Sequence, residues 1–189
     1  MIPLVLGLFV FIGIHLVPTC PSTRGNVTAR FGEGPYKGLF SLVALVGLVL
    51  IIYGFSEARY AASGNPQLWD PPRWMRHVTM TLMLPVFVLL AAAYLPGRIS
   101  AAVKHPMLLS VKLWAFAHLL VSARLANFIL FGALLAWAVY DRISVKRRAL
   151  PIKSGPMRND IIALVIGLVA YAFMLLQGHT LLIGVPLIS

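Results

Sequence analysis

Two histidines, His15 and His118, lie well inside apolar stretches and are the main candidates for chemistry in this sequence. An imidazole in hydrocarbon surroundings needs a hydrogen-bond partner or a metal ion. None of the apolar segments predicted below contains a carboxylate that could supply the hydrogen bond. Hydrogen bonding to other groups and metal ligation therefore stay open as the two explanations for these histidines.

Haem binding is the form of metal ligation that best suits two isolated imidazoles. Two neutral histidines from different helices can hold one haem iron as its axial ligands. Small residues beside the histidines, Gly13 and Ala117 among them, would let a flat macrocycle approach the backbone. We therefore predict that His15 and His118 are the metal-binding and cofactor-binding residues.

The other three histidines have a simpler interpretation. His77 and His105 each open an apolar segment, and His179 lies late in the last one. A histidine near the membrane interface is readily hydrated, so we expect these three to be structural, capping or solvated. His105 and Lys112 share one face of their predicted helix, whereas His105 and His118 point to nearly opposite sides of it.

The elements that must position these residues are membrane helices. The chain has 189 residues, of which 60% are hydrophobic and 11% charged, with a mean hydropathy of +0.89. A soluble domain of this size could not bury so much apolar surface, and several segments approach the run of about 20 apolar residues that crosses a bilayer. We predict an all-α polytopic membrane bundle that forms a single domain over residues 1–189. Its six apolar segments are about 2–17, 38–55, 78–95, 106–121, 125–140 and 161–185.

Two features of these segments bear on how they would cross the bilayer. The first and the fourth are short for a hydrocarbon core of roughly 30 Å. The fourth and fifth could also form one broken helix, because Ser122-Ala123-Arg124 between them is a thin signal for a turn.

The charges predict contact with anionic lipids. The formal net charge is +11, from 16 Lys and Arg against 5 Asp and Glu. Because nearly all of these charges lie between the apolar segments, we expect them to meet anionic headgroups and not nucleic acid. The first, third and fifth loops hold most of the basic residues, so the positive-inside rule places them in the cytoplasm and both termini in the periplasm. The single cysteine, Cys20, excludes an intrachain disulfide and a zinc site built from cysteines.

Five blocks of sequence occur in an order typical of one family. They are GEGPYKGLFSLV from Gly32, WDPPRWMRH from Trp69, HPMLLSVKLWAFAHLL from His105, LAWAVYDRISVKRR from Leu135 and RNDIIALVIG from Arg158. Together they resemble the NnrU family of bacterial membrane proteins over nearly the whole chain. The resemblance implies a protein of the bacterial inner membrane. It also implies respiratory or denitrification proteins as partners, because the family is named for gene neighbourhoods of nitrite and nitric oxide reduction.

The resemblance also implies a cofactor. NnrU proteins are similar to the plastid 15-cis-ζ-carotene isomerase, an integral membrane enzyme with a b-type haem. Its two histidine ligands match His15 and His118 of this chain, which implies haem b at these residues. The isomerase has a cysteine, an alternative ligand, where this chain has Ala115. The chain therefore retains the pattern for bis-histidine binding but not the one for a ligand-switching isomerase.

The leading functional hypothesis is a haem-binding membrane protein that acts in nitrite or nitric oxide reduction or as a haem-dependent isomerase. One alternative is a lipid or isoprenyl methyltransferase, because Lys104-His105-Pro106 resembles the basic-His-Pro step of isoprenylcysteine methyltransferases. In that case the basic run 142–148 could receive an anionic substrate. The other alternative is a non-catalytic assembly subunit for denitrification enzymes.

Overall fold

The computed structural model describes residues 1–61, 63–149 and 151–188 and is helical over most of them. Within these residues no strand forms, which confirms the all-α prediction. Five helical stretches are long and apolar enough to cross a membrane. They are α1 with the 3-10 turn η1 (Ile2–Thr19), α3 (Glu33–Tyr60), α4 (Met75–Tyr94), α7 (Leu125–Arg147) and the continuous stretch Met157–Ile183. A sixth apolar helix, α6 (Pro106–Val121), is shorter, as the sequence predicted.

The break between α6 and α7 is confirmed, and backbone pairing explains it. The chain leaves the helical conformation at residues 122–124, where Gln67 and Arg124 form an isolated antiparallel bridge. The N–H of Leu68 donates to the carbonyl of Ala123, and the N–H of Leu125 donates to the carbonyl of Pro66. A strand-like contact from a distant loop thus ends one helix and starts the next.

Several helices extend beyond the predicted apolar segments, and three of these extensions include a carboxylate. Their polar ends remain helical, so Glu57 lies within α3, Asp141 within α7 and Asp160 within the helix α8 (Met157–Phe173). Two further helices, α2 (Pro21–Phe31) and α5 (Arg98–Val103), form inside predicted loops. The expectation that no carboxylate belongs to a membrane helix is therefore wrong at the helix ends.

The described residues form two compact units, each made of two separate parts of the chain. Unit 1 contains Met1–Pro71 and Ser122–Arg148, and unit 2 contains Pro72–Val121 and Ala149–Ser189. The expectation of a single domain over residues 1–189 stays a prediction.

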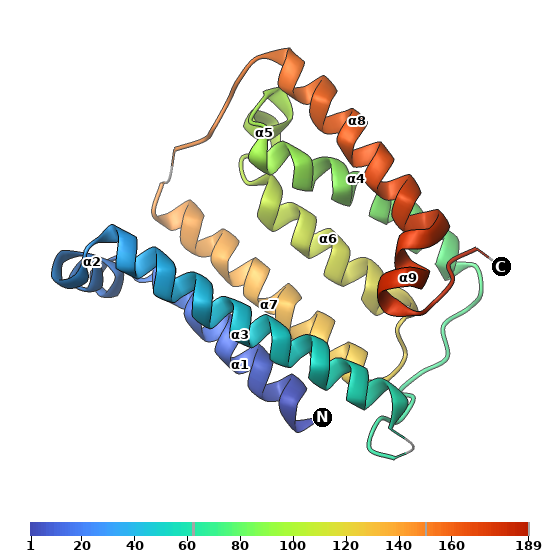
Figure 1. The fold of residues 1–189 in the computed structure, drawn as a ribbon. Coiled ribbons are helices and arrows are strands. Elements are labelled where there is room, and N and C mark those ends of the chain that lie inside the picture. The colour runs from blue at the N-terminus through green and yellow to red at the C-terminus, as the bar shows by residue number, and fades with distance from the viewer. Residues whose placement is uncertain (62, 150, 189) are drawn as a thin grey trace. The chain divides into compact units, whose positions relative to one another are not determined.

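Unit 1 is built on the close packing of α1 against α3, which lie side by side (Figure 1). Three glycines permit this approach. A Cβ atom on Gly47 would lie 2.7 Å from the backbone nitrogen of Phe11, and one on Gly7 would lie 2.6 Å from that of Ile51. A side chain on Gly54 would likewise collide with the backbone of Leu4. Glycines at such positions let two membrane helices pack backbone to backbone.

Asn65 joins the end of α3 to the start of α7 within unit 1. Its side chain is buried, with 6% of the residue exposed. The side-chain nitrogen donates to the carbonyl of Ala58 at 3.0 Å, and the side-chain oxygen accepts from the N–H of Ala126 at 2.9 Å. Both polar ends of the amide are therefore satisfied, as a buried polar group requires.

Unit 2 is organised around α4, which packs between α6 and α8 (Figure 1). The buried hydroxyl of Ser110 on α6 donates to the carbonyl of Val86, and that of Thr79 on α4 donates to the carbonyl of Ala117. On the other side of α4, Gly167 of α8 lies directly against the backbone of Val88. Hydroxyl bonds and close glycine contact therefore fix α4 on both sides.

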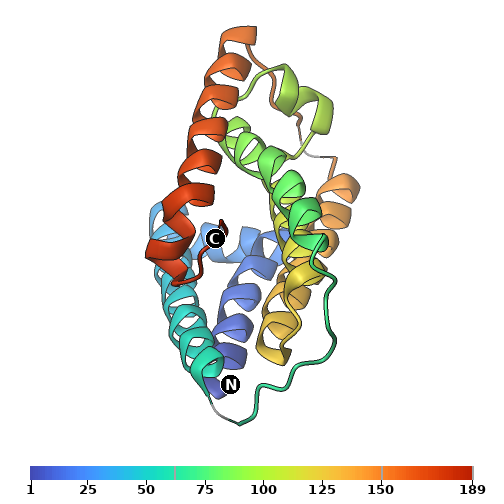
Figure 2. The same ribbon diagram turned by 90° about the vertical axis from the view of Figure 1, so that its right-hand side faces the viewer.

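The C-terminal part of unit 2 is irregular. After α8 the helix widens into a π-helical turn, η2 (Met174–Gly178), and ends in α9 (His179–Ile183). Gly184 then adopts a left-handed conformation with φ of 74°, and the chain turns back beside α9 (Figures 1 and 2). π-helical turns within α-helices are often found at functional sites.

Candidate functional site

His15 lies in the last turn of α1 in unit 1, and its ring is bonded to its own helix. Its Nδ1 donates to the carbonyl oxygen of Phe11, four residues earlier, at 2.7 Å. Because a carbonyl oxygen can only accept, the proton must be on Nδ1. In the neutral imidazole the lone pair is then on Nε2, the nitrogen that can bind a metal.

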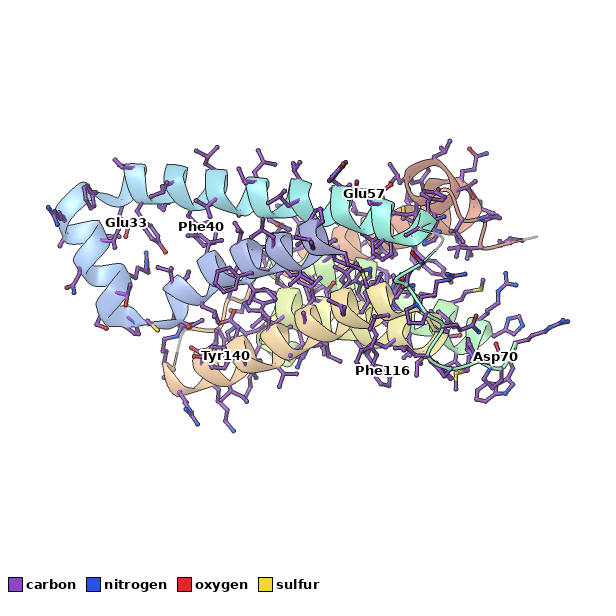
Figure 3. The ribbon with its side chains drawn as sticks, turned by 90° about the horizontal axis from the view of Figure 1, so that it is seen from below. Glu33, Phe40, Glu57, Asp70, Phe116 and Tyr140 are labelled. Atoms are coloured by element: carbon purple, nitrogen blue, oxygen red, sulfur yellow. The ribbon has the colours of Figure 1, made fainter. Side chains whose placement is uncertain are left out.

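Aromatic rings surround the imidazole of His15. The ring centroid of Phe11 lies 4.2 Å away, that of Phe40 5.1 Å and that of Trp137 5.3 Å. These rings come from α1, α3 and α7, and Figure 3 shows Phe40 pointing from α3 toward α1. Three elements of unit 1 thus build an apolar enclosure around one polar ring.

Two buried polar groups of this aromatic cluster have no hydrogen-bond partner within the described residues. They are the indole Nε1 of Trp137 and the hydroxyl of Tyr36, whose ring lies 6.3 Å from that of Phe40. A buried donor without a partner is costly, and such groups usually meet water or a bound molecule. The neighbourhood of His15 therefore contains two buried polar groups that the described side chains leave without a hydrogen bond.

His118 lies in the last turn of α6 in unit 2 and is partly buried. Its Nδ1 donates to the carbonyl oxygen of Trp114 at 2.8 Å, and its ring lies 5.3 Å from the indole of Trp114. The neighbouring residues Ala115 and Ala117 are fully buried. Since the carbonyl of Ala117 accepts the hydroxyl of Thr79, α6 is attached to α4 directly before His118.

The two predicted ligands share one local design. Each histidine stands four residues after an aromatic residue that supplies both a neighbouring ring, tilted against the imidazole, and the carbonyl that binds Nδ1. The helix repeat produces this geometry, because residues four apart lie on the same face. The spacing is visible in the sequence as Phe-x-x-x-His and Trp-x-x-x-His, but the hydrogen bonds were not among the predictions.

His179 lies late in the last apolar stretch, as the sequence predicted. It begins α9 directly after the π-helical turn, and its Nδ1 donates to the carbonyl of Val185 at 2.7 Å. This bond closes the C-terminal turn, so of the roles that the sequence left open His179 has a structural one. His179 and His118 both belong to unit 2.

The remaining two histidines, His77 and His105, lie at helix starts. His77 lies in the first turn of α4, and His105 precedes Pro106 at the start of α6, as predicted. His105 is therefore at the opposite end of α6 from His118. Among the described residues, no three His, Cys, Asp or Glu side chains are grouped so that they could hold a metal ion. His15 belongs to unit 1 and His118 to unit 2, so their predicted pairing on one iron stays a prediction.

A comparison with known protein families shows which family this chain belongs to. The model of the family described as NnrU protein matches residues 3–187. The chain belongs to the NnrU family. The resemblance predicted from the five sequence blocks is thus confirmed, and with it the description of this NnrU protein as a multi-helix membrane protein. No curated protein and no solved structure matches the chain.

Proposed function

We propose that this NnrU protein binds haem b in the bacterial inner membrane, with His15 and His118 as axial ligands, and serves nitrite or nitric oxide reduction. Haem bound in this way would supply one-electron redox chemistry or an iron centre for a small ligand. The proposal includes a periplasmic location of both termini, which follows from the loop charges and from six crossings that include the short α6.

One observation carries the proposal: both histidines donate Nδ1–H to a backbone carbonyl of their own helix. This bond fixes the tautomer and the ring orientation, and it makes Nε2 the basic nitrogen. Histidines that bind metals usually have such a partner for their other nitrogen. The same arrangement at two histidines in separate apolar helices supports them as the residues that would hold the haem iron.

The residues around both histidines support the proposal. Phe40 and Trp137 supply flat apolar walls in unit 1, and Ala115 and Ala117 keep the surface of α6 small in unit 2. The unpartnered Trp137 Nε1 is a donor that could bind a polar edge of the macrocycle. Ala115 offers no sulfur, so two imidazoles and no thiolate would set the properties of the iron.

Absorption spectra of the purified protein test haem binding. The wild-type protein, isolated in detergent and supplied with haemin, should show a Soret band and the sharp α and β bands of bis-histidine haem on reduction. His15→Ala and His118→Ala should each lose this spectrum, whereas His77→Ala, at the end of another helix, should keep it. A wild-type protein that shows no Soret band after haemin addition contradicts the proposal.

His179→Ala tests which histidine is the partner of His118. With the proposed pair, this variant keeps the bis-histidine spectrum because His179 only caps the C-terminal turn. If His179→Ala abolishes the spectrum and His15→Ala does not, both ligands belong to unit 2 and the assignment of His15 is wrong.

Membrane preparations test the link to respiration. Nitric oxide or nitrite consumption should fall in membranes that carry the His15→Ala/His118→Ala double variant at the wild-type protein level. Unchanged consumption would instead favour a non-catalytic assembly subunit.

A further inference from the structure

A cleft of about 330 Å³ lies within unit 2 where the end of α4, the short α5 and the start of α6 meet. Apolar residues, among them Ala93, Pro96, Met107 and Leu108, form most of its walls. The cleft lies at the opposite end of α6 from His118. Within unit 2 it is therefore separate from His118, the predicted haem ligand of that unit.

All charged side chains that line the cleft are basic. Lys104 lies between α5 and α6, and Lys153 lies in the segment before α8. The ionisable ring of His105 lines the cleft beside them, and none of the described lining residues is acidic. Asp160 is held at the other end of α5, where its carboxylate accepts the N–H groups of Arg98 and Ile99. The cleft thus has a positive charge that its own walls do not neutralise.

Helix α6 adds to this positive potential. It begins at Pro106, and Met107 and Leu108 of its first turn form part of the wall. The first N–H groups of a helix have no carbonyl partner within it, and the helix dipole makes this end partly positive. A helix start beside two lysines favours an anionic group, above all a phosphate.

Lys104 occupies a backbone position that favours glycine. Its φ is 67°, which L-residues with a side chain rarely adopt. Its N–H donates to the carbonyl of Ser100, which closes the end of α5 and keeps the turn in place. Strained residues of this kind concentrate at binding sites.

The segment that carries Lys153 is held against the same cleft. The side-chain nitrogen of Asn159 donates to the carbonyl of Pro96 at 2.7 Å. Gly155 also lies so close to Pro96 that a methyl group on it would collide with that carbonyl. Lys153 is only two residues from Gly155, so these contacts keep it near Lys104.

We propose that this lysine cleft binds the phosphate headgroup of an anionic membrane phospholipid, with the apolar wall taking the beginning of its acyl chains. Two lysines and a helix start meet the phosphate, while Ala93 and Met107 suit the chains. The site lies where apolar helices end, which is headgroup level, and Tyr94 at the end of α4 is 75% exposed, as aromatic residues of the interface are. A phospholipid would use both the basic residues and the apolar wall of the cleft, whereas soluble phosphate would use only the basic residues.

Lipid titration of the purified full-length protein tests the lysine cleft. Native mass spectrometry in detergent would measure the apparent Kd for palmitoyl-oleoyl phosphatidylglycerol. Lys104→Gln/Lys153→Gln should weaken binding about 10- to 30-fold, since each lysine near a membrane surface contributes roughly a factor of five. Lys104→Arg/Lys153→Arg should retain binding, and its normal melting curve would show that substitution at these positions permits folding.

Lys37→Gln/Lys146→Gln is the matched control. It removes the same charge from two exposed positions outside the cleft, and binding should stay within about twofold of wild type. Equal weakening in the control and cleft variants would overturn the proposal in favour of diffuse surface attraction. If phosphatidylcholine bound as tightly as phosphatidylglycerol, the negative charge of the lipid would have no role in binding and the proposal would be overturned. Displacement of the lipid by millimolar inorganic phosphate would show that the cleft is a site for a soluble anion.

Discussion

The close contact of α1 with α3 makes a prediction whose magnitude follows from the structure. A Cβ atom on Gly47 would lie 2.7 Å from the backbone nitrogen and 2.9 Å from the Cα of Phe11. Unstrained contacts of this kind are roughly 3.5–4.0 Å long, so Gly47→Ala must move α1 away from α3 by about 1 Å. Overpacking of this extent costs about 1–3 kcal/mol.

The higher helix propensity of alanine partly offsets this cost, and substitution of a second glycine in the same helix gives the size of the offset. Replacing glycine with alanine in a helix contributes up to about 1 kcal/mol of stability. Gly38 also lies in α3, but a Cβ atom on it would meet no other element of the described chain within 4 Å. Gly38→Ala should therefore show only the gain, and Gly47→Ala should be about 1–3 kcal/mol less stable than Gly38→Ala.

Unfolding in detergent micelles by increasing dodecyl sulfate, followed by circular dichroism, gives the two free energies of unfolding. The same displacement moves Phe11, whose carbonyl fixes the ring of His15. Gly47→Ala should therefore also weaken any haem spectrum that depends on His15. Equal free energies of unfolding for Gly47→Ala and Gly38→Ala would refute the close packing of α1 and α3.

Two further substitutions test how the helix ends are held. Asn65→Ala removes a buried amide that bonds both α3 and α7, so the free energy of unfolding should fall by about 2–3 kcal/mol. Gln67→Ala is the control, because Gln67 lies in the same loop but is exposed, and it should change the free energy of unfolding by less than about 0.5 kcal/mol. Asp160→Ala leaves the first N–H groups of α5 without their acceptor and should lower the free energy of unfolding by about 1–2 kcal/mol. Amide hydrogen exchange should become faster only at residues 98–103, which distinguishes this local effect from a general loss of stability.

The apolar helices were predictable from the sequence because hydropathy alone marks them. The bounds of α6 agree with the predicted segment, and the break at residues 122–124 was anticipated. Helix α2 was missed because it is polar, although Pro21 at its first position and Gly32 after its end, with φ of 86°, are recognised start and stop signals. Helix α5 is only six residues long and depends on Asp160, which lies some 60 positions away in the sequence.

The candidate site was predictable only in part, for a similar reason. His15 and His118 were recognisable because each interrupts an apolar run, and their bonds to residues four positions earlier are local. The contacts of His15 with Phe40 and Trp137 depend on how distant helices pack. Contacts between side chains of distant helices cannot be predicted from the periodicity of a single sequence, because they depend on tertiary packing.

The interleaving of the two units has a consequence for synthesis. Unit 1 needs α7, which is translated only after α4, α5 and α6 of the other unit, and unit 2 in turn waits for α8. In a nascent chain that has released α1 and α3 into the bilayer, this pair must therefore wait for α7 while α4 and α6 of the other unit are inserted. Neither unit corresponds to a contiguous gene fragment, so evolution or truncation cannot separate them by a single cut.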